Sequence, residues 1–213
     1  MPGLDAPTAT ESELVPRFSP TERTLHWLLA STFLTMLVTG LILELPALAE
    51  LAADRRLWKS IHLGSAIGFW AGLVVLLLTT RSELAPVADE LDRFDDDDRE
   101  WVRWAVTRRG DEPPQGRFNA GQKLNTAVIA GLLVVLTVSG TLMYLSEVNA
   151  SFRGTNAILI HDLATWVAIP LVLGHLFLVL VNPSTRPSLR GMVRGSVRRD
   201  WARRHHPKWE KTL

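Results

Sequence analysis

Long runs of apolar residues dominate the pattern of hydrophobic and polar positions along this chain of 213 residues. Four runs contain about 20 or more mostly apolar residues, the length that a helix needs to cross the ~30 Å hydrocarbon core of a bilayer. These runs are residues 25–45, 61–80, 124–145 and 157–181. Segments 73–78 and 132–136 have no polar face, and a soluble bundle would have to bury such helices on all sides, which a chain of this length cannot do. The pattern therefore predicts an all-α membrane protein with four transmembrane helices.

Polar segments precede, connect and follow the predicted spans, which together form one membrane domain of residues 25–181. Residues 1–24 make an N-terminal arm, residues 81–123 the longest connection, and residues 182–213 a basic tail. The arm is polar and the first apolar run is too long for the core of a signal peptide, so we expect no cleavable signal.

The distribution of Lys and Arg predicts the orientation of the spans. An even number of spans places both termini on one side. Of the 23 Lys and Arg residues, two lie in the arm, eight in the 81–123 connection and nine in the tail, against four on the other side. The positive-inside rule therefore places both termini and this connection in the cytoplasm. We expect a multi-pass protein of a bacterial-type inner or plasma membrane.

Four of the six histidines lie within the apolar runs: His26, His62, His161 and His175. An ionisable side chain inside a membrane is energetically expensive and usually marks a functional site. Imidazole is also a common protein ligand of haem iron. A single histidine near the end of a span, such as His26 or His62, can instead reach the membrane interface. His175 is surrounded by apolar neighbours and has no such alternative.

The predicted depths of these histidines arrange them in two pairs. His62 and His161 begin the second and fourth spans at the outer side, and His26 begins the first span at the inner side. His175 follows His161 by 14 residues, which places it roughly 21 Å deeper and about 40° around the helix axis. Depth therefore pairs His62 with His161 on an outer haem, and His26 with His175 on an inner haem. Iron with two axial histidines has no easy open site, so such haems are suited to electron transfer.

The chain contains no cysteine. This excludes covalent haem attachment through C-x-x-C-H and any cysteine-ligated iron–sulfur cluster on this chain, so the two haems are expected to be of the b type. The sequence also shows no phosphate-binding loop, nucleophile–base arrangement or nucleotide fingerprint, and we expect no nucleic-acid partner. Electrons must then arrive from one partner and leave to another.

Small residues and a proline add weaker indications. Gly64, Gly68 and Gly72 recur every fourth residue after His62, and such a bare groove is open to a flat macrocycle or to a neighbouring helix. Pro170 lies between the two histidines of the fourth span and predicts a kink there.

The 81–123 connection has its own pattern. Residues 95–98 are four aspartates, interpreted as a solvated helix start because carboxylates favour helix N-termini. Trp101 and Trp104 follow at helical spacing among arginines, which predicts a short interfacial helix that ends at Pro113. Paired His205 and His206 in the tail suggest a metal site, but we favour a surface segment that docks against the inner loops. The basic tail is also expected to attract anionic membrane lipid.

Asn119 and Gln122 precede the third span at the predicted inner border of the membrane. Asn119 is a good helix cap, which is one reading of this pair. Three residues apart, the two amides also share one helical face, where they could hydrogen-bond the carbonyl of a quinone close to the inner haem.

Several short motifs resemble those of a known family. They are Arg23-x-x-His26-Trp27, Leu57 with His62 five residues later, the run RFNAGQK at 117–123, His161 with His175, and the run DWARRHHPKW at 200–209. From about Arg17 to its end, the chain is similar to the cytochrome b (gamma) subunit of respiratory membrane-bound formate dehydrogenase. The NAGQK string and the W-A-basic-basic-H-H-P-basic-W string are the specific ones.

The resemblance implies roles for individual residues. The four histidines match the haem ligands of that family in the pairing given above, with two haem b groups. Asn119, Gln122 and His175 match residues that surround its menaquinone site, so menaquinone or ubiquinone is the expected substrate.

The resemblance also implies partners and a division of labour. Formate is oxidised outside by a molybdenum or tungsten catalytic (alpha) subunit, and an iron–sulfur (beta) subunit passes electrons to this chain, which delivers them to a quinone near the cytoplasmic side. Formate oxidation itself is then not performed here, and a higher oligomer of the complex is compatible with this arrangement. One alternative is a di-haem cytochrome b of a nickel–iron hydrogenase or thiosulfate reductase. The other is a haem-free membrane anchor or transporter whose histidines line a proton path.

Overall fold

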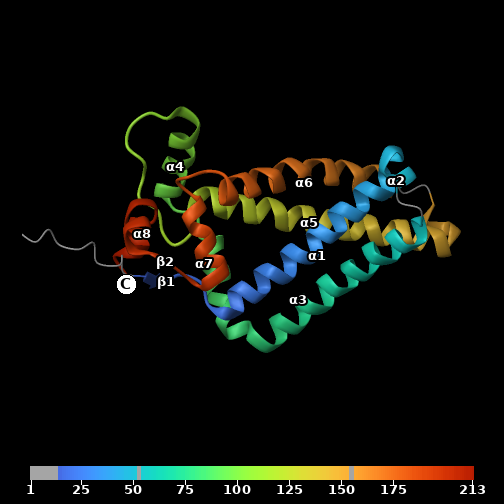
Figure 1. Ribbon diagram of the computed structural model, residues 1–213, viewed down its shortest axis with the longest axis horizontal. Helices are drawn as coiled ribbons and strands as arrows, with labels where there is room; N and C mark the ends of the chain where they lie inside the picture. The colour runs from blue at the N-terminus through green and yellow to red at the C-terminus, as the bar shows by residue number, and fades with distance from the viewer. Residues whose placement is uncertain (1–13, 52–53, 154–155) are drawn as a thin grey trace, which may run out of the picture. The chain divides into compact units, whose positions relative to one another are not determined.

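The computed structural model describes residues 14–51, 54–153 and 156–213. Residues 1–13 of the expected N-terminal arm lie outside the described residues. The chain divides into two compact units, one of residues 18–89 and one of residues 90–213 together with the segment that ends at Arg17. Figure 1 shows the helices and the two short strands in chain order.

The unit of residues 18–89 contains helices α1 (Pro20–Glu44) and α2 (Pro46–Leu51) and most of α3 (Arg55–Asp92). A capping box starts α1: the Ser19 hydroxyl accepts from the Glu22 N–H at 3.2 Å, and the Glu22 carboxylate accepts from the Ser19 N–H at 2.7 Å. This reciprocal pair satisfies two backbone donors that a helix start leaves without partners. Pro20 occupies the first turn, where its missing N–H does no harm.

Helices α1 and α3 run antiparallel and touch through side chains. A Cβ built on Gly72 of α3 would lie 2.6 Å from Leu28 Cδ2 of α1. The leucine can pack at this position because glycine has no side chain. Nearer the start of α1, the Thr21 hydroxyl donates to the Glu83 carboxylate. Helix packing is therefore the observed role of Gly72, whereas a Cβ on Gly64 or Gly68 would meet no atom of the described residues within 4 Å.

Helix α3 is interrupted where the second predicted span ends. Thr80 has non-helical dihedrals, φ −129° and ψ 21°. The hydroxyls of Thr79 and Thr80 donate back to the carbonyls of Val75 and Leu76 at 2.8 and 2.6 Å, and such back-bonding often bends helices. The helix continues to Asp92, so part of the segment expected as a connection is helical.

The second helix pair consists of α5 (Ala120–Val148) and α6 (Ala157–Leu180), joined through the 3-10 turn η1 (Ala150–Phe152). The two helices pack along their lengths (Figure 1). Helix α6 continues as one helix through Pro170. A continuous helix across this residue agrees with the tolerance of membrane helices for proline, and the kink expected at Pro170 stays a prediction.

Among the described residues, α1, α3, α5 and α6 are long and apolar enough to cross a membrane. Large apolar side chains lie on their surfaces, including Ile67 at 70% and Leu78 at 80% exposure. The prediction of an all-α protein with four membrane-spanning helices is confirmed in these terms. The helices are longer than the apolar runs because their end turns are polar, as in the capping box of α1, and an apolar run does not include polar turns.

The ends of the chain fold together into a terminal module, which comprises residues 14–17 and 186–213. Strand β1 (Leu14–Pro16) pairs antiparallel with β2 (Ser196–Arg198), with Val15 opposite Val197. Val15, Val197, Trp201 and Ala202 form a small buried core, against which Trp209 packs. The other elements of the module are η2 (Arg186–Ser188), α7 (Leu189–Arg194), α8 (Arg199–His205) and α9 (Pro207–Glu210).

Helix α4 (Asp96–Thr107) corresponds to the expected interfacial helix. Asp95 caps it in a second capping box with Asp98, so the acidic run does start a helix. The helix ends at Thr107, where Arg108 adopts a left-handed conformation with φ 53°. The expected end at Pro113 was wrong, because the chain leaves the helix at this residue before the proline is reached.

The two helix pairs begin alike. An Arg-Phe dipeptide, at 17–18 and again at 117–118, precedes a cap residue, Ser19 in one case and Asn119 in the other. Each cap residue forms a capping box with the side chain three positions on. The hairpins α1–α3 and α5–α6 thus start as internal repeats, offset by 100 residues.

The two arginines of this repeat also hold each other. Arg17 Nη2 donates to the backbone carbonyl of Arg117 at 2.9 Å, and Arg117 Nη1 donates to the backbone carbonyl of Arg17 at 3.1 Å. Arg117 is further fixed by an ion pair with Glu90 at 2.9 Å. Each arginine side chain therefore bonds the backbone of the other arginine, two residues before the cap residue of the other helix.

Candidate functional site

His62 lies near the start of α3 and faces Thr39 of α1. Its Nδ1 is 3.0 Å from Thr39 Oγ1. The Thr39 hydroxyl donates its hydrogen to the Thr35 carbonyl at 2.7 Å. It can therefore only accept a hydrogen bond from the histidine. Nδ1 of His62 must therefore carry the hydrogen, and in the neutral ring the lone pair lies on Nε2.

His161 has the same environment in the other unit. Its Nδ1 is 3.0 Å from Ser139 Oγ of α5. The serine hydroxyl donates to the Val135 carbonyl at 2.7 Å, so it too accepts from the imidazole, which also has a hydrogen bond with the Leu136 backbone. Thr39 and Ser139 are almost completely buried, at 2% and 3% exposure. Both histidines are thus held as the tautomer that presents the Nε2 lone pair, which is the form that binds metal.

A glycine follows the hydroxyl residue in both cases. A Cβ built on Gly140 would lie 3.2 Å from His161 Cε1, and a Cβ on Gly40 would lie 3.5 Å from His62 Cε1. The first distance is tighter than ordinary contact and the second is not. Glycine at these positions lets the edge of each imidazole approach the neighbouring helix backbone.

The other two histidines lie on the same helical hairpins. His26 is on α1 in the unit that holds His62, and its ring centroid is 5.3 Å from that of Trp27. His175 is on α6 with His161, and their spacing of 14 residues puts them on nearly the same helical face. Each expected pair takes one histidine from each unit, and the pairing stays a prediction.

These residues fit haem b. The donor set is imidazole, which haem iron accepts at its axial positions, and two of the rings are already oriented by neighbouring hydroxyls. The Cβ directions of Gly64 and Gly68 on α3 meet no described atom within 4 Å, which leaves a smooth helix face just beyond His62.

The expected quinone residues begin α5. Asn119 caps the helix: its Oδ1 accepts from the Gln122 N–H at 2.9 Å, and Gln122 Oε1 accepts from the Asn119 N–H at 3.0 Å. The capping alternative is therefore what the structure contains. Because both oxygens face backbone donors, both amide NH₂ groups point elsewhere. A quinone carbonyl needs such donors, so capping and quinone binding are compatible.

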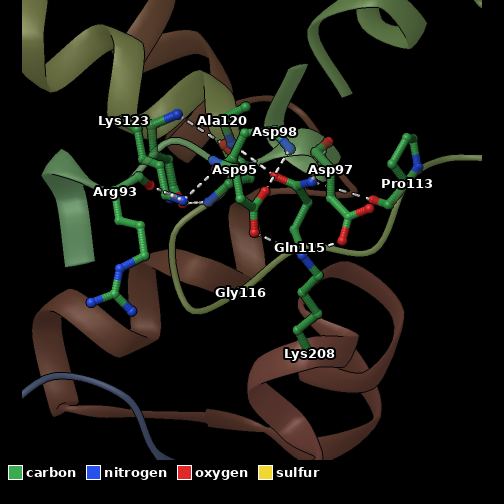
Figure 2. Close-up of polar contacts among 12 residues, drawn as sticks. Arg93, Asp95, Asp97, Asp98, Pro113, Gln115, Gly116, Ala120, Lys123 and Lys208 are labelled. Atoms are coloured by element: carbon green, nitrogen blue, oxygen red, sulfur yellow. Dashed lines mark hydrogen bonds and ion pairs between the residues drawn. The ribbon is translucent and has the colours of Figure 1, made fainter. Parts of the chain in front are cut away.

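A polar cluster fixes this helix start (Figure 2). Gln115 Oε1 accepts from the Ala120 N–H at 2.8 Å, and Gln115 is 2% exposed. Lys123 Nζ pairs with Asp98 Oδ2 at 2.6 Å, with side chains only 11% and 3% exposed. Lys208 of the tail pairs with Asp95 Oδ2 at 3.0 Å.

The sequence interpretation missed Gln115 and treated the acidic run as solvated. Asp98 is in fact buried, at 2% exposure, because its partner Lys123 comes from α5. The local signal for the helix start was present, since Asp95 and Asp98 have capping-box spacing. The ion pair, which joins residues 25 positions apart, leaves no local pattern.

His206 docks the tail against the loop that contains Gly116, and docking was the reading favoured from the sequence. Its Nδ1 donates to the Gly116 carbonyl at 2.7 Å, and its Nε2 accepts from Arg17 Nη2 at 3.1 Å. Burial and the nearby Arg17 charge lower the pKa of His206 to about 3, so this ring is neutral. The Arg17 guanidinium also lies over the Trp201 ring, 4.9 Å from its centroid.

Burial and the nearby Arg117 lower the pKa of Arg17 to about 9. The side chain still keeps its positive charge at neutral pH, because this value is about two units above neutrality. With Arg17 charged, both ring nitrogens of His206 are engaged in hydrogen bonds within the protein, as expected for a tail that docks and not for a metal site.

Known proteins are similar to this chain over most of its length. The nitrate-inducible formate dehydrogenase cytochrome b556(Fdn) subunit of Escherichia coli K12 is 24% identical over 96% of this chain and 94% of its own length. The cytochrome b556(fdo) subunit of the same organism is 23% identical over 94% of both chains. The formate dehydrogenase cytochrome b556 subunit of Haemophilus influenzae is 25% identical over 86% of this chain and 77% of its own.

These relatives confirm the resemblance that the short motifs indicated. The model of the prokaryotic cytochrome b561 family matches residues 17–195, which include all four membrane helices and all four histidines. The match extends from Arg17 to Gly195, the glycine that ends α7. With this match and its hydroxyl-held imidazoles, the chain belongs to the prokaryotic cytochrome b561 family, membrane electron-transfer proteins that bind haem b.

Proposed function

We propose that this chain is the membrane-anchoring cytochrome b subunit of a respiratory formate dehydrogenase and carries electrons from an iron–sulfur partner to a quinone. The observation that carries the proposal is the pair of buried hydroxyls that hold the Nδ1–H tautomers of His62 and His161. A hydrogen bond at the far ring nitrogen is the usual support of a metal-binding histidine. The near full-length similarity to cytochrome subunits of formate dehydrogenases supports the choice of complex.

Four histidines hold two haem b groups in this proposal. His62 and His161 bind the outer haem, and His26 and His175 bind the inner haem. The matching positions of these residues along the predicted spans support the pairing. Bound haem b supplies one-electron iron chemistry, and two axial imidazoles suit it to electron transfer. The protein's part is to fix the tautomer and direction of each ring and to keep the site apolar.

Both termini, the terminal module and the 81–123 region lie in the cytoplasm in this proposal. Nineteen of the 23 Lys and Arg residues then lie on the cytoplasmic side, as the positive-inside rule requires. Trp101 and Trp104 of α4 suit the cytoplasmic interface, where amphipathic aromatic rings gather.

The quinone, menaquinone or ubiquinone, is reduced at the start of α5. Asn119 and Gln122 donate their NH₂ groups to one of its carbonyl oxygens, and His175 lies beside it. The capping box supports this role because it orients both amides with their oxygens toward the helix backbone. Gln115 and the pair Lys123–Asp98 keep the helix start rigid. Protons for the reduced quinone come from the cytoplasm.

The partners are the iron–sulfur (beta) subunit and the molybdenum or tungsten catalytic (alpha) subunit, which oxidises formate on the outer side. Because formate is oxidised outside while the quinone takes its protons inside, turnover moves charge across the membrane without a proton pump in this chain.

The complex can be tested after solubilisation and purification through a tag on this chain. We expect two protohaems per chain by pyridine haemochrome analysis, co-purification of both partners, and reduction of the haem α-bands when formate is added. A flat reduced-minus-oxidised spectrum would exclude the cytochrome. Reduction by hydrogen but not by formate would reassign the donor to a nickel–iron hydrogenase, and oxidation of the reduced haems by thiosulfate would indicate a thiosulfate reductase.

The ligand pairs need a separate test. Replacing His62 or His161 by alanine should remove one and the same haem, and replacing His26 or His175 should remove the other. Loss of different haems from the His62 and His161 variants would show that the pairing is wrong.

A further inference from the structure

We propose that Thr39 and Ser139 are the positioning residues of a single haem, and that their hydroxyls set its reduction potential through His62 and His161. The proposal rests on the assignment of these histidines as haem ligands. It adds two residues to the site and an independent reason for pairing His62 with His161.

The first step is the direction of the hydrogen bonds. Each hydroxyl donates to the carbonyl four residues earlier, at 2.7 Å in both helices. Each therefore accepts from the imidazole Nδ1–H at 3.0 Å. An imidazole that donates from Nδ1 is a more basic ligand at Nε2, and its ring is fixed in direction. A more basic ligand stabilises ferric over ferrous iron, which lowers the reduction potential.

The second step is the repetition. Thr39 is the twentieth residue of α1, and Ser139 is the twentieth residue of α5. Both helices start with an Arg-Phe dipeptide and a capping box, and both hydroxyl residues are followed by a glycine against the imidazole edge. Two segments 100 residues apart thus build the same surroundings for one histidine each.

The third step is depth. In the proposed topology, α1 and α5 both enter from the cytoplasm, so their twentieth residues lie at matching depths, roughly 28 Å along the helix from the first residue. Two histidines with equal depth and equal surroundings are suited to the two faces of one haem.

The other two histidines do not follow the repeat. At the 100-residue offset, His26 corresponds to Thr126. At the 99-residue offset that relates His62 to His161, His175 corresponds to Leu76. One haem therefore takes its ligands from equivalent positions of the two hairpins, and the other takes them from positions that differ. The hydroxyl effect should then be confined to one of the two haems.

The experiment uses the purified full complex and a redox titration that resolves the two haems, together with their ferric EPR signals. Thr39→Val and Ser139→Ala remove the acceptors. Matched controls are Thr35→Val and Ser146→Ala, whose hydroxyls donate to the Ser31 and Met143 carbonyls at 2.8 and 2.7 Å. Thr39→Ser and Ser139→Thr keep a hydroxyl at the site.

We expect Thr39→Val and Ser139→Ala to raise the midpoint potential of the same haem and to leave the other unchanged. A tenfold change in the preference of the site for ferric over ferrous iron, at the low end for a supporting partner of a metal ligand, corresponds to about 59 mV for one electron. The control variants and the two hydroxyl-retaining variants should titrate like the wild type.

Other outcomes also decide the question. Loss of the same haem from both acceptor variants, with both haems kept in the controls, supports the proposal even where no potential can be measured. Shifts in different haems, no shift in either, or equal shifts in the controls would overturn it. A wild-type complex without haem would instead overturn the proposed function, so the two failures can be told apart.

Discussion

The terminal module should lose stability as the pH falls from 7.5 to 5, because it buries a neutral histidine. The pKa of His206 is about 3 in the folded chain, against an ordinary value of 6.5. Between these values the unfolded module binds a proton that the folded module does not, so stability is complete above pH 6.5 and falls as the pH drops toward 3. At pH 5 the loss from this residue amounts to about 2 kcal/mol.

The window from pH 7.5 to 5 separates His206 from most other groups of the module. Arg17, with a pKa of about 9, keeps its charge throughout. Burial also lowers the pKa of His205, which therefore adds a contribution of the same sign. Asp95 is held below its ordinary pKa by the Asp98 N–H and by Lys208, against the opposing effect of burial, and it titrates below this window.

The assay is hydrogen exchange of residues 195–210, with tryptophan fluorescence as a second probe, in the full chain at both pH values. Trp201 reports on the contact because its ring lies 5.1 Å from that of His206. In His206→Gln, which cannot titrate, most of the pH dependence should disappear and only the contribution of His205 should remain, whereas His205→Gln should reduce it only in part. Equal protection of the wild type at pH 5 and 7.5, or an unchanged pH dependence in His206→Gln, would refute the reasoning.

Three further predictions concern the membrane site. Gly140→Ala should weaken or abolish binding of one haem, because its Cβ would lie 3.2 Å from His161 Cε1; the haem-to-protein ratio measures this. Gln122→Glu should keep the capping box, which favours glutamate, but remove the NH₂ donor, so quinone-site inhibitors should bind less tightly at unchanged haem content. Lys123→Met leaves the buried Asp98 carboxylate without its ion pair, and denaturant unfolding should show a loss of about 3 to 5 kcal/mol.

Matched variants separate these effects from general damage. Gly40→Ala should be milder than Gly140→Ala, because its Cβ would sit at an ordinary 3.5 Å from His62 Cε1; equal losses would contradict the steric argument. Normal inhibitor binding in Gln122→Glu would remove this side chain from the quinone site. The double variant with Asp98→Asn should recover part of the stability lost in Lys123→Met, and no recovery would mean that the ion pair is not the cause.

The membrane helices were predictable because each span needs about 20 apolar residues, and such a run can be recognised from consecutive residues alone. Their ends were less visible. Ser19 and Asn119 start their helices several residues before the apolar runs, through capping boxes. Thr80 interrupts α3 at a position that the apolar pattern did not indicate, and its hydroxyl donates back to the Leu76 carbonyl.

The histidines were predictable as candidate ligands because ionisable groups are rare in apolar runs. Their supporting hydroxyls were not, since Thr39 and Ser139 look like ordinary small polar residues of membrane helices. The 100-residue repeat that joins them was present in the sequence, but only a few of its positions are identical. Contacts such as Lys123–Asp98 and His206–Gly116 connect distant segments, and they are determined by tertiary packing alone.

The pairing of β1 with β2 has a consequence for biosynthesis. Leu14 lies opposite Arg198, so β1 cannot pair with β2 until residue 198 has left the ribosome. By then every apolar run has already been translated, so the helical hairpins can insert into the membrane before β1 pairs with β2. Closure of β1 on β2 is therefore a late event in assembly, because β2 is translated after all four membrane helices.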